Sequence, residues 1–336
     1  MLNTTQLTAE QESAMKAIVQ YKYGSPDVLE LREVDKPVVG DDDVLVRVRA
    51  ASVNPFDWHM MRGRPYLARI QAGLLKPKQP IQGADMAGQV VAVGRNVTLF
   101  QPGDEVFGEY KRTFAEYVCV PEHGIAPKPT NLTFEQAAAI PLAGITALQG
   151  LRDKGQIRQG HKVLINGASG GVGTFAVQIA KSFGAEVTGV CSTRNVDMVR
   201  SIGADHVIDY TKENFTERDE RYDLILDLVN SHSLSDYKRV MNRKGVYVLG
   251  GSAQMGDWVE PLTEVFKVLL ASVVGSQKMV PLLAKIRNED MIVLKELAEA
   301  EKVTPVIDRR YPLSEVQEAL WYQGEGHAQG KTVITI

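Results

Sequence analysis

The chain has 336 residues, of which 44% are hydrophobic and 24% charged, and its formal net charge at pH 7 is −3. This length allows two globular domains with substantial cores, and the weak charge excludes a generally basic surface for nucleic acid or an anionic membrane. No apolar stretch is long enough to span a bilayer, so a membrane partner is not expected. Residues 1–14 lack a secretory signal pattern and are interpreted as a flexible N-terminal extension.

The cysteine content favours a cytoplasmic protein. Cys119 and Cys191 are the two cysteines, and they lie far apart in the sequence. Their spacing gives neither a disulfide framework nor a metal cluster, which is compatible with a reducing compartment. Small-molecule chemistry in the cytoplasm is therefore the expectation.

Short β-like segments separated by Gly, Pro and Asp fill the chain from Met15 to about Val120. The alternation in VLVRVRA and QVVAVG is typical of half-buried strands, so these segments predict an all-β module. The segments are 16–21, 43–53, 87–94, 104–110 and 114–120.

The pattern then changes to helix. Thr133 is a plausible N-cap ahead of Glu135 and Gln136, and the apolar run that follows predicts one helix reaching Leu151. Beyond it, strand and helix patterns alternate in the rhythm of a doubly wound parallel sheet. The predicted strands are 163–166, 186–190, 206–209, 224–229 and 245–250; the predicted helices are 172–183, 196–202 and 234–241. A helical pattern at 291–300 and β-like segments at 303–308 and 331–336 complete the chain.

A glycine-dense turn lies between the first strand and the first helix of this second half. Ala168, Gly170 and Gly173 fit the A-x-G-x-x-G variant of the Rossmann fingerprint, and Gly171 stands between the last two. The glycines allow the backbone to approach a pyrophosphate at the helix N-terminus. The turn therefore predicts a dinucleotide site; the alternative is a turn that only packs helix against sheet.

The residues after the next strand favour NADPH over NADH. Where NAD-binding sheets usually carry Asp or Glu, this chain has Ser192, Thr193 and Arg194. Arg194 can form a forked, charge-assisted contact with the adenosine 2′-phosphate, and the hydroxyls can donate to it. The alternative is that Ser192, Thr193 and Asn195 cap the next helix.

The chain after Met15 resembles the zinc-independent quinone oxidoreductase branch of the medium-chain dehydrogenase/reductase family, including its zeta-crystallin-like and reticulon-interacting oxidoreductase-like members. The motifs occur in family order: VNPFDWHMMRG near Asn54, GADMAGQVVAVG near Gly83, FQPGDEVFG near Gly103, ITAL near Thr146, GASGGVG, SIGADHVIDY near Tyr210, and EGHAQGKTVITI at the end. The resemblance implies an α/β fold: a Rossmann doubly wound parallel sheet plus a GroES-like β-barrel catalytic domain. It divides the chain into GroES-like residues 15–138 and 304–336 and Rossmann NADP-binding residues 139–303, and it implies a homodimer.

The resemblance also implies that no metal is used. Zinc alcohol dehydrogenases of the superfamily have a Cys ligand in the region of Asn54 and a Gly-His-Glu motif. Here residues 52–54 are Ser-Val-Asn and residues 83–85 are Gly-Ala-Asp. Two dispersed cysteines cannot supply the four needed for a structural zinc lobe. Without a Lewis acid, hydride transfer to an electron-poor quinone or enone is favoured over alcohol oxidation.

Two catalytic residues are implied by the N-P-F-D motif. Asn54 and Asp57 are expected beside the nicotinamide, where the Asn54 amide can donate to a substrate or ribose oxygen and Asp57 can orient it. The alternative is that Asn54 starts a turn that Asp57 caps. Tyr66, His59 and Tyr110 are possible proton donors, and water is another.

The implied cofactor contacts come from the glycine turn, from the ends of the strands and from the C-terminal tail. They are Thr146, Ser169, Gly170, Gly171, Val172, Gly173, Ser192, Thr193, Arg194, Tyr210, Val229, Asn230, Leu249, Gly250, His327, Ala328, Gln329 and Lys331. Gln329 departs from the family pattern, in which an Arg commonly follows Gly-His-Ala. Lys331 partly replaces that charge, or is simply solvated.

The leading functional hypothesis is an NADPH-dependent reductase that transfers hydride to a small-molecule quinone or α,β-unsaturated carbonyl. One alternative is an enoyl-thioester reductase, for which Arg62, Arg64 and Arg69 are candidates to bind a carrier phosphate unless they form a solvated loop. Another is a non-catalytic NADPH-binding sensor or structural protein.

Overall fold

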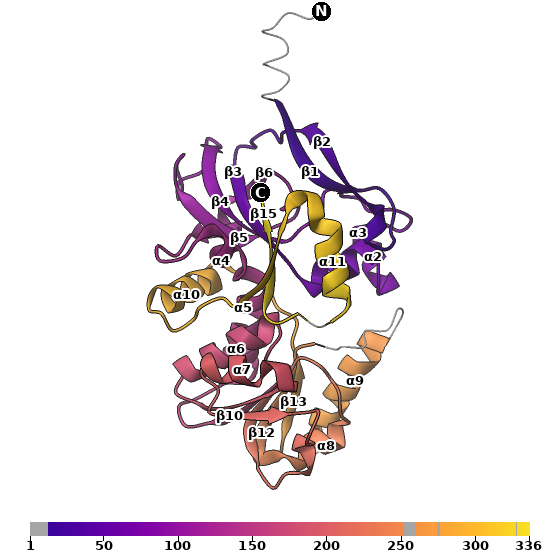
Figure 1. Cartoon of the computed structure of the whole chain (residues 1–336), viewed down its shortest axis with the longest axis vertical. Helices are drawn as coiled ribbons and strands as arrows, with labels where there is room; N and C mark the ends of the chain where they lie inside the picture. The colour runs from indigo at the N-terminus through magenta and orange to yellow at the C-terminus, as the bar shows by residue number, and fades with distance from the viewer. Residues whose placement is uncertain (1–12, 252–259, 274–275, 327) are drawn as a thin grey trace, which may run out of the picture.

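The computed structural model describes residues 13–251, 260–273, 276–326 and 328–336, which form two lobes, each built on its own β-sheet (Figure 1). The expected N-terminal extension lies almost wholly outside the described residues. None of the described helices is long and apolar enough to cross a membrane.

The lower lobe in Figure 1 contains a six-stranded parallel sheet in the order β10-β9-β8-β11-β12-β13. This is the Rossmann strand order, and it reverses between β8 and β11, so the prediction of a doubly wound sheet is confirmed. The strands are β8 (Lys162–Asn166), β9 (Glu186–Cys191), β10 (His206–Asp209), β11 (Tyr222–Asp227), β12 (Met241–Leu249) and β13 (Lys278–Pro281). The helices are α6 (Gly171–Ser182), α7 (Val196–Ser201), α8 (Leu234–Arg239) and α9 (Glu260–Val273).

Both faces of this sheet are covered, which explains its nearly continuous apolar strands. On β8, Val163 and Ile165 join the core cluster that contains Phe175 of α6. Leu164, which points to the other face, joins the cluster that contains Tyr237 of α8 and Val268 of α9. The alternation of side chains along each strand therefore buries two separate cores.

The upper lobe contains a seven-stranded sheet built from both ends of the chain. Its order is β14-β15-β3-β4-β5-β7, and β6 also pairs with β3. The strands are β3 (Asp43–Val53), β4 (Asp85–Val93), β5 (Glu105–Glu109), β6 (Tyr117–Pro121), β7 (Ile125–Pro127), β14 (Ile307–Pro312) and β15 (Lys331–Thr335), beside the separate pair β1 (Ala14–Gln20) and β2 (Leu29–Asp35). The antiparallel pairing of β15 with β3 places the C-terminal strand beside the segment that leads into Asn54.

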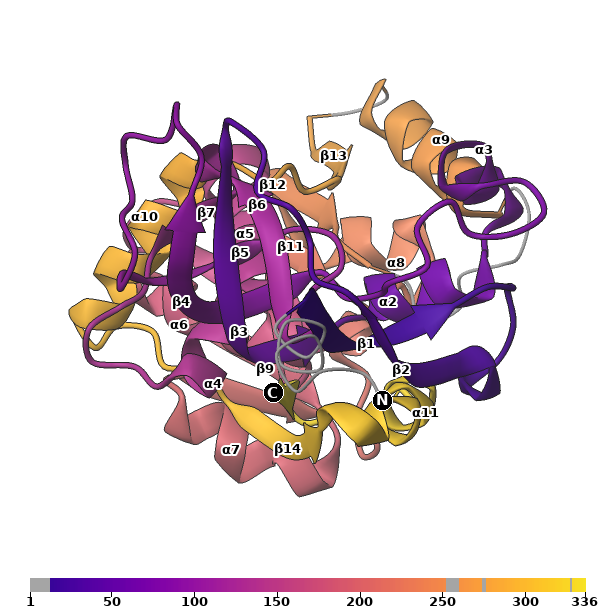
Figure 2. The ribbon, with the colours of Figure 1, turned by 90° about the horizontal axis from the view of Figure 1, so that it is seen from above.

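The helices α2 (Pro55–Arg62), α3 (Arg69–Ala72) and α11 (Val316–Gly324) also belong to this lobe. Figures 1 and 2 both place α3 on the same side of the molecule as α9 of the other lobe. The predicted all-β module therefore also contains helices.

The first connection between the lobes is broken where one helix was predicted. Thr133 is the N-cap, as expected, and its Oγ1 accepts from the Gln136 backbone N–H at 3.2 Å. The helix α4 (Phe134–Ala138) then ends, and α5 (Pro141–Leu148) begins and continues into a π-helical turn at residues 149–154. Pro141 has no N–H to donate within a continuous helix, so it starts a new one.

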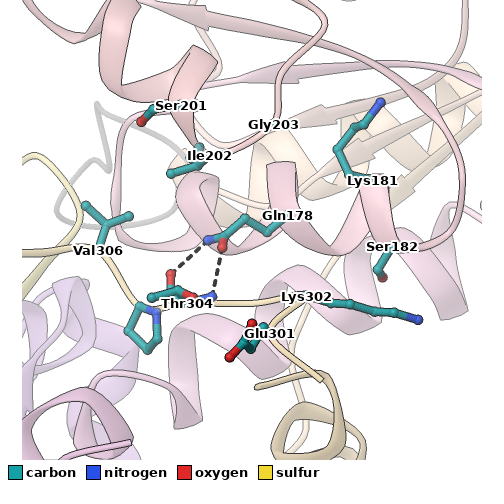
Figure 3. A pocket seen from close by; sticks show the side chains of 11 residues that line it. Gln178, Lys181, Ser182, Ser201, Ile202, Gly203, Glu301, Lys302, Thr304 and Val306 are labelled. Atoms are coloured by element: carbon teal, nitrogen blue, oxygen red, sulfur yellow. Dashed lines mark hydrogen bonds between the residues drawn. The ribbon is translucent and has the colours of Figure 1, made fainter. Parts of the chain in front are cut away.

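The return connection follows α10 (Asn288–Glu299) and passes over the C-terminal half of α6. Figure 3 shows how Gln178 of α6 holds it: the Gln178 amide donates to the Thr304 carbonyl at 3.0 Å and accepts from the Thr304 N–H at 2.8 Å. The predicted strand at 303–308 therefore begins only at Ile307. The surrounding hollow, of about 610 Å³, extends to Gly203 and Lys302, and its lining residues include none of the glycine turn.

Candidate active site

The glycine turn has the close-packed backbone that a dinucleotide site requires. Gly170 is the N-cap of α6, and Gly171 is its first residue. A Cβ added to Gly173 would lie 2.1 Å from the Gly167 carbonyl oxygen, whereas a Cβ on Gly170 would meet nothing closer than 3.6 Å. Gly173 is therefore needed to fold the turn onto the helix, while the backbone at Gly170 remains open for a ligand to approach.

The C-terminal tail lies directly on this turn. The Gly330 N–H donates to the Ser169 carbonyl at 2.9 Å, and Gly330 forms an isolated parallel bridge with Gly170. A Cβ built on Gly171 would lie 3.1 Å from Cδ of Lys331. Gln329 is held by its N–H, which donates to Asp308 at 2.8 Å. Of the tail residues assigned to the cofactor, Lys331 thus adjoins the glycine turn, and His327 lies outside the described residues.

The region after β9 combines an exposed arginine with a buried amide that the sequence argument did not assign to the site. Arg194 is exposed. Asn195 is buried, and its Nδ2 donates to the Ser169 and Ser192 hydroxyls at 3.0 and 3.3 Å. Its Oδ1 has no hydrogen-bond partner among the described residues. Asn195 therefore joins the glycine turn to the end of β9 and leaves one buried acceptor for a ligand hydroxyl.

A carboxylate from the neighbouring strand modifies the predicted role of Thr193. The Thr193 hydroxyl donates to Asp209 at 2.6 Å, and this hydrogen bond is the main reason that the Asp209 pKa lies below its usual value. Thr193 thus holds Asp209 as well as lying beside Arg194. The adjacent Tyr210 is exposed and free to cover a flat group.

A buried aspartate organises the loops at the carboxyl ends of the central strands. Asp227, at the end of β11, is fully buried and accepts from the Val229 and Asn230 N–H groups at 3.1 and 2.9 Å. Its carbonyl accepts from the Gly250 N–H at 2.7 Å. Asn230 has a positive φ of 58°, which this hydrogen bonding supports. Asp227 therefore positions three of the residues assigned to the cofactor. Its place directly after the apolar strand residues LIL is the sequence feature that could have indicated this role.

A buried polar network lies where β15 meets β3, beside the glycine turn. Lys331 is only 3% exposed, and its Nζ donates to Asn54 Oδ1 at 2.5 Å and to the Val53 carbonyl at 3.2 Å. The same Nζ lies 3.5 Å from the fully buried carboxylate of Asp85. Lys331 is thus neither solvated nor directed only at the cofactor; its ammonium compensates a buried carboxylate.

The Asn54 amide is fully engaged within the protein. Its Nδ2 donates to Asp85 at 2.9 Å and to the Ser52 carbonyl at 3.4 Å, while its Oδ1 faces Lys331. Asp57 accepts from the Asn54 backbone N–H at 2.8 Å, which caps α2. In this arrangement Asn54 orients the network through both ends of its amide, and the capping role considered for Asp57 is present.

Three carboxylates share this region, and the Lys331 ammonium acts on two of them, Asp85 and Asp57. Burial raises the pKa of Asp57 to about 7, and the nearby Lys331 opposes that rise. Burial, together with Asp85 and Asp57, likewise raises the pKa of Glu109 to about 7. Glu109 was not assigned to the site from the sequence. Burial lowers the Lys331 pKa, while Asp85 and Asp57 oppose this effect.

Three other residues considered for chemistry have contacts of their own. The Thr146 hydroxyl donates to the Leu142 carbonyl of its own helix at 2.7 Å. Burial, followed by the adjacent Arg62, lowers the pKa of His59, so a neutral His59 is the form expected at neutral pH. Tyr66 is stacked by Arg64 and Arg69, with the guanidinium carbons 5.6 and 4.7 Å from its ring centroid.

Within the described residues, no group of three or more His, Cys, Asp or Glu side chains is arranged to hold a metal ion. At the positions of the zinc ligands in related dehydrogenases, the structure has Asn54 and Asp85, which hydrogen-bond to each other. The cation beside them is the Lys331 ammonium.

The structure joins a doubly wound sheet with a glycine turn to a second, β-rich lobe, and the C-terminal strand of that lobe reaches the turn. This combination defines a two-domain oxidoreductase that uses a nicotinamide dinucleotide. The comparisons specify it further. Residues 40–130 match the alcohol dehydrogenase GroES-like domain, and residues 202–334 match a domain described as zinc-binding dehydrogenase. The chain belongs to the medium-chain dehydrogenase/reductase family, in its zinc-independent quinone oxidoreductase branch.

Several relatives match almost the whole chain. The mouse mitochondrial NAD(P)H oxidoreductase RTN4IP1 is 34% identical over 98% of this chain and 91% of its own. The chloroplastic NADPH-dependent alkenal/one oxidoreductase of Arabidopsis thaliana is 34% identical, covering 95% of this chain and 79% of its own. The structure of the quinone oxidoreductase from Coxiella burnetii superimposes with a TM-score of 0.83 at 30% identity, covering 96% of this chain and 99% of that one. The predicted family and fold are therefore confirmed.

Proposed function

We propose that this protein is an NADPH-dependent, zinc-independent reductase of quinones or α,β-unsaturated carbonyls. The observation that carries the proposal is the contact between the Lys331–Asn54–Asp85 network and the glycine turn, because it joins a polar, water-poor site to a dinucleotide site. The names of the similar alkenal/one and quinone oxidoreductases support the same substrate class.

The residues present fit NADPH. The open backbone at Gly170 and the buried, unpartnered Asn195 Oδ1 would receive the pyrophosphate and a hydroxyl of the adenosine half. Arg194 would hold the 2′-phosphate. The remaining assignments from the glycine turn, the strand ends and the tail are kept as part of this proposal.

When bound, NADPH supplies a hydride, and a conjugated acceptor receives it by delocalising negative charge onto oxygen. The chain's own contribution is to align the acceptor and to exclude water. Asn54 and Asp57 fix the backbone at the start of α2, and Lys331 fixes the Asn54 amide. The positive Lys331 also favours negative charge developing nearby.

The first test is anaerobic NADPH oxidation with a quinone and a short 2-alkenal, repeated with NADH and with a chelator. We expect turnover with NADPH that the chelator does not reduce. Tight NADPH binding without turnover of any acceptor would instead favour a sensor or structural role. The proposal includes a cytoplasmic homodimer, supported by resemblance, which sedimentation of the purified protein would test.

Replacing Arg194 by Ala should weaken NADPH far more than NADH. The lost charge-assisted contact is worth about 2 kcal/mol, which corresponds to roughly a thirtyfold rise in the NADPH dissociation constant. Titration calorimetry with both cofactors measures this difference. Arg200→Ala, at an exposed arginine of α7, is the matched control. Equal weakening of both cofactors would refute the phosphate assignment.

Replacing Asn54 by Ala should lower kcat while leaving NADPH affinity nearly intact. The substitution removes an acceptor from Lys331 and a donor from Asp85, both of which are buried, so it costs about 1–3 kcal/mol of local stability. We expect kcat to fall roughly tenfold to a hundredfold, as measured by steady-state kinetics at saturating NADPH. An unchanged kcat would remove Asn54 from the mechanism.

A further inference from the structure

Glu109 lies at the end of β5 and extends the buried network by one strand. In the antiparallel pairs of this sheet, Asp85 of β4 lies opposite Ser52 of β3 on one side and opposite Glu109 on the other. Residues directly opposite each other in such pairs point to the same face of the sheet. The side chains of Ser52, Asp85 and Glu109 therefore form one polar row across three strands.

The face that carries this row also holds the start of the connection to the Rossmann lobe. Asp85 accepts from the N–H of Leu142 at 3.0 Å, and Leu142 belongs to α5, the helix that leads into that lobe. The same carboxylate lies 3.5 Å from the Lys331 ammonium, whose side chain adjoins the glycine turn. Glu109 therefore shares a face of the sheet with the groups that join the network to the proposed dinucleotide site.

Glu109 differs from the two aspartates of the network because its carboxyl is not engaged. Both oxygens of Asp85, which is fully buried, accept hydrogen bonds, and Asp57, which is 3% exposed, caps the start of α2. Glu109 is half-buried, and its carboxyl forms no hydrogen bond or ion pair with any residue that the structure describes. It can therefore exchange protons with water on one side while it adjoins the network on the other.

The charges around Glu109 favour its protonated form near neutral pH. Three charged groups act on it: Asp85 of β4, Asp57 of α2 and the exposed Lys111, which follows β5. Burial and the two aspartates raise the Glu109 pKa to about 7, and Lys111 opposes this rise. The other elements packed against β5 add no unpaired charge, since β7 and α5 contain no charged residue and Glu135 of α4 is paired with Arg310.

We propose that Glu109 is the acid that donates the proton needed to complete reduction of the acceptor. This inference rests on the proposed reductase function and adds a catalytic residue to it. Hydride transfer leaves negative charge on the acceptor oxygen, and the O–H bond of the Glu109 carboxyl then breaks as a new O–H bond forms at that oxygen. The acceptor gains one hydride and one proton as NADPH is oxidised to NADP⁺, and Glu109 regains its proton from water. An enol formed in this way tautomerises to the saturated carbonyl compound.

Titration of the carboxyl tests the acid without any cofactor. Protein isotopically labelled at the δ-carbon of glutamate is followed by NMR across neutral pH, and the Glu109 resonance is the one missing from Glu109→Gln. We expect this resonance to titrate with a pKa of about 7, and at higher pH in Lys111→Gln, which removes the opposing charge. A resonance that titrates in the usual range of a glutamate would overturn the proposal.

Steady-state kinetics at saturating NADPH then test the role of Glu109 in the reaction. The wild-type kcat should fall about tenfold for each pH unit above 7, because the acid form is lost, and in Lys111→Gln the fall should begin at higher pH. Glu109→Gln should lower kcat below pH 7 about a hundredfold and remove this pH dependence, whereas Glu109→Asp should retain it. Glu33→Gln, at an exposed glutamate of β2, is the control and should match the wild type.

The outcomes separate this inference from the proposed function. Asp57 has a similar pKa and is unchanged in Glu109→Gln, so a fall of kcat with pH that persists in that variant would belong to Asp57. That result, with an active wild-type protein, would overturn the role of Glu109 and leave the reductase function intact. If the wild-type protein reduces neither a quinone nor a 2-alkenal, the reductase function fails and this inference fails with it.

Discussion

The variant Lys331→Met is expected to lose at least a hundredfold in kcat/KM and about 3 kcal/mol in the free energy of unfolding. Methionine fills a similar volume but leaves Asp85 fully buried without the ammonium that lies 3.5 Å away. Breaking a buried pair on one side typically costs 3–5 kcal/mol, so ~3 kcal/mol is a moderate expectation. The loss of kcat/KM follows because Asn54 loses the donor that fixes its amide.

Denaturant unfolding and steady-state kinetics measure the two effects. Lys302→Met, at an exposed lysine in the segment between the lobes, is the control for loss of a lysine as such. The double variant Lys331→Met/Asp85→Asn should be more stable than Lys331→Met, because it removes the uncompensated charge as well. Additive losses in the double variant would show that the two charges do not interact.

The pH dependence of the free energy of unfolding provides a second test of Lys331, because a lysine with only a packing role would not change it. The Asp57 pKa is about 7 in the folded protein and 3.8 for an unperturbed aspartate, so the folded state binds more protons between these values. The contribution of Asp57 to stability is therefore full below about pH 3.8 and declines as pH rises toward 7. Lys331 lowers the Asp57 pKa, so in Lys331→Met the decline should continue to higher pH.

The fold was largely predictable because its signals are local. Apolar strands, a glycine turn and amphipathic helices repeat at short range, and they specify the doubly wound sheet strand by strand. The error at the first connection is also local in origin: Pro141 lies inside an otherwise continuous apolar run, and its missing N–H divides the predicted helix.

The site was less predictable because its contacts are not local. Asn54 and Lys331 are 277 residues apart in sequence, and their contact exists only because β15 pairs with β3. The N-P-F-D motif indicated a site near Asn54, yet no short-range pattern indicates that both ends of its amide are used internally. Asn195 and Asp227 have local partners, but each also has a distant one that no short-range pattern indicates: Asn195 donates to Ser169 of the glycine turn, and Asp227 accepts from Asn166 of β8.

The glycine turn supports a second prediction with a large effect, in which two glycines of one motif behave differently. Gly173→Ala should destabilise the protein by about 3 kcal/mol and abolish NADPH binding, because the new Cβ would lie 2.1 Å from the Gly167 carbonyl oxygen. The better helix propensity of alanine returns only about 1 kcal/mol. Backbone atoms cannot rotate away, so the turn itself must shift.

Gly170→Ala is the matched variant, because the same methyl group there meets no atom closer than 3.6 Å. We expect it to unfold at the wild-type temperature and to lose affinity only for the cofactor, whose pyrophosphate must approach this backbone. Thermal unfolding with and without NADPH separates the two effects. If Gly173→Ala unfolded at the wild-type temperature and bound NADPH normally, the close packing of the turn would not be required for either function.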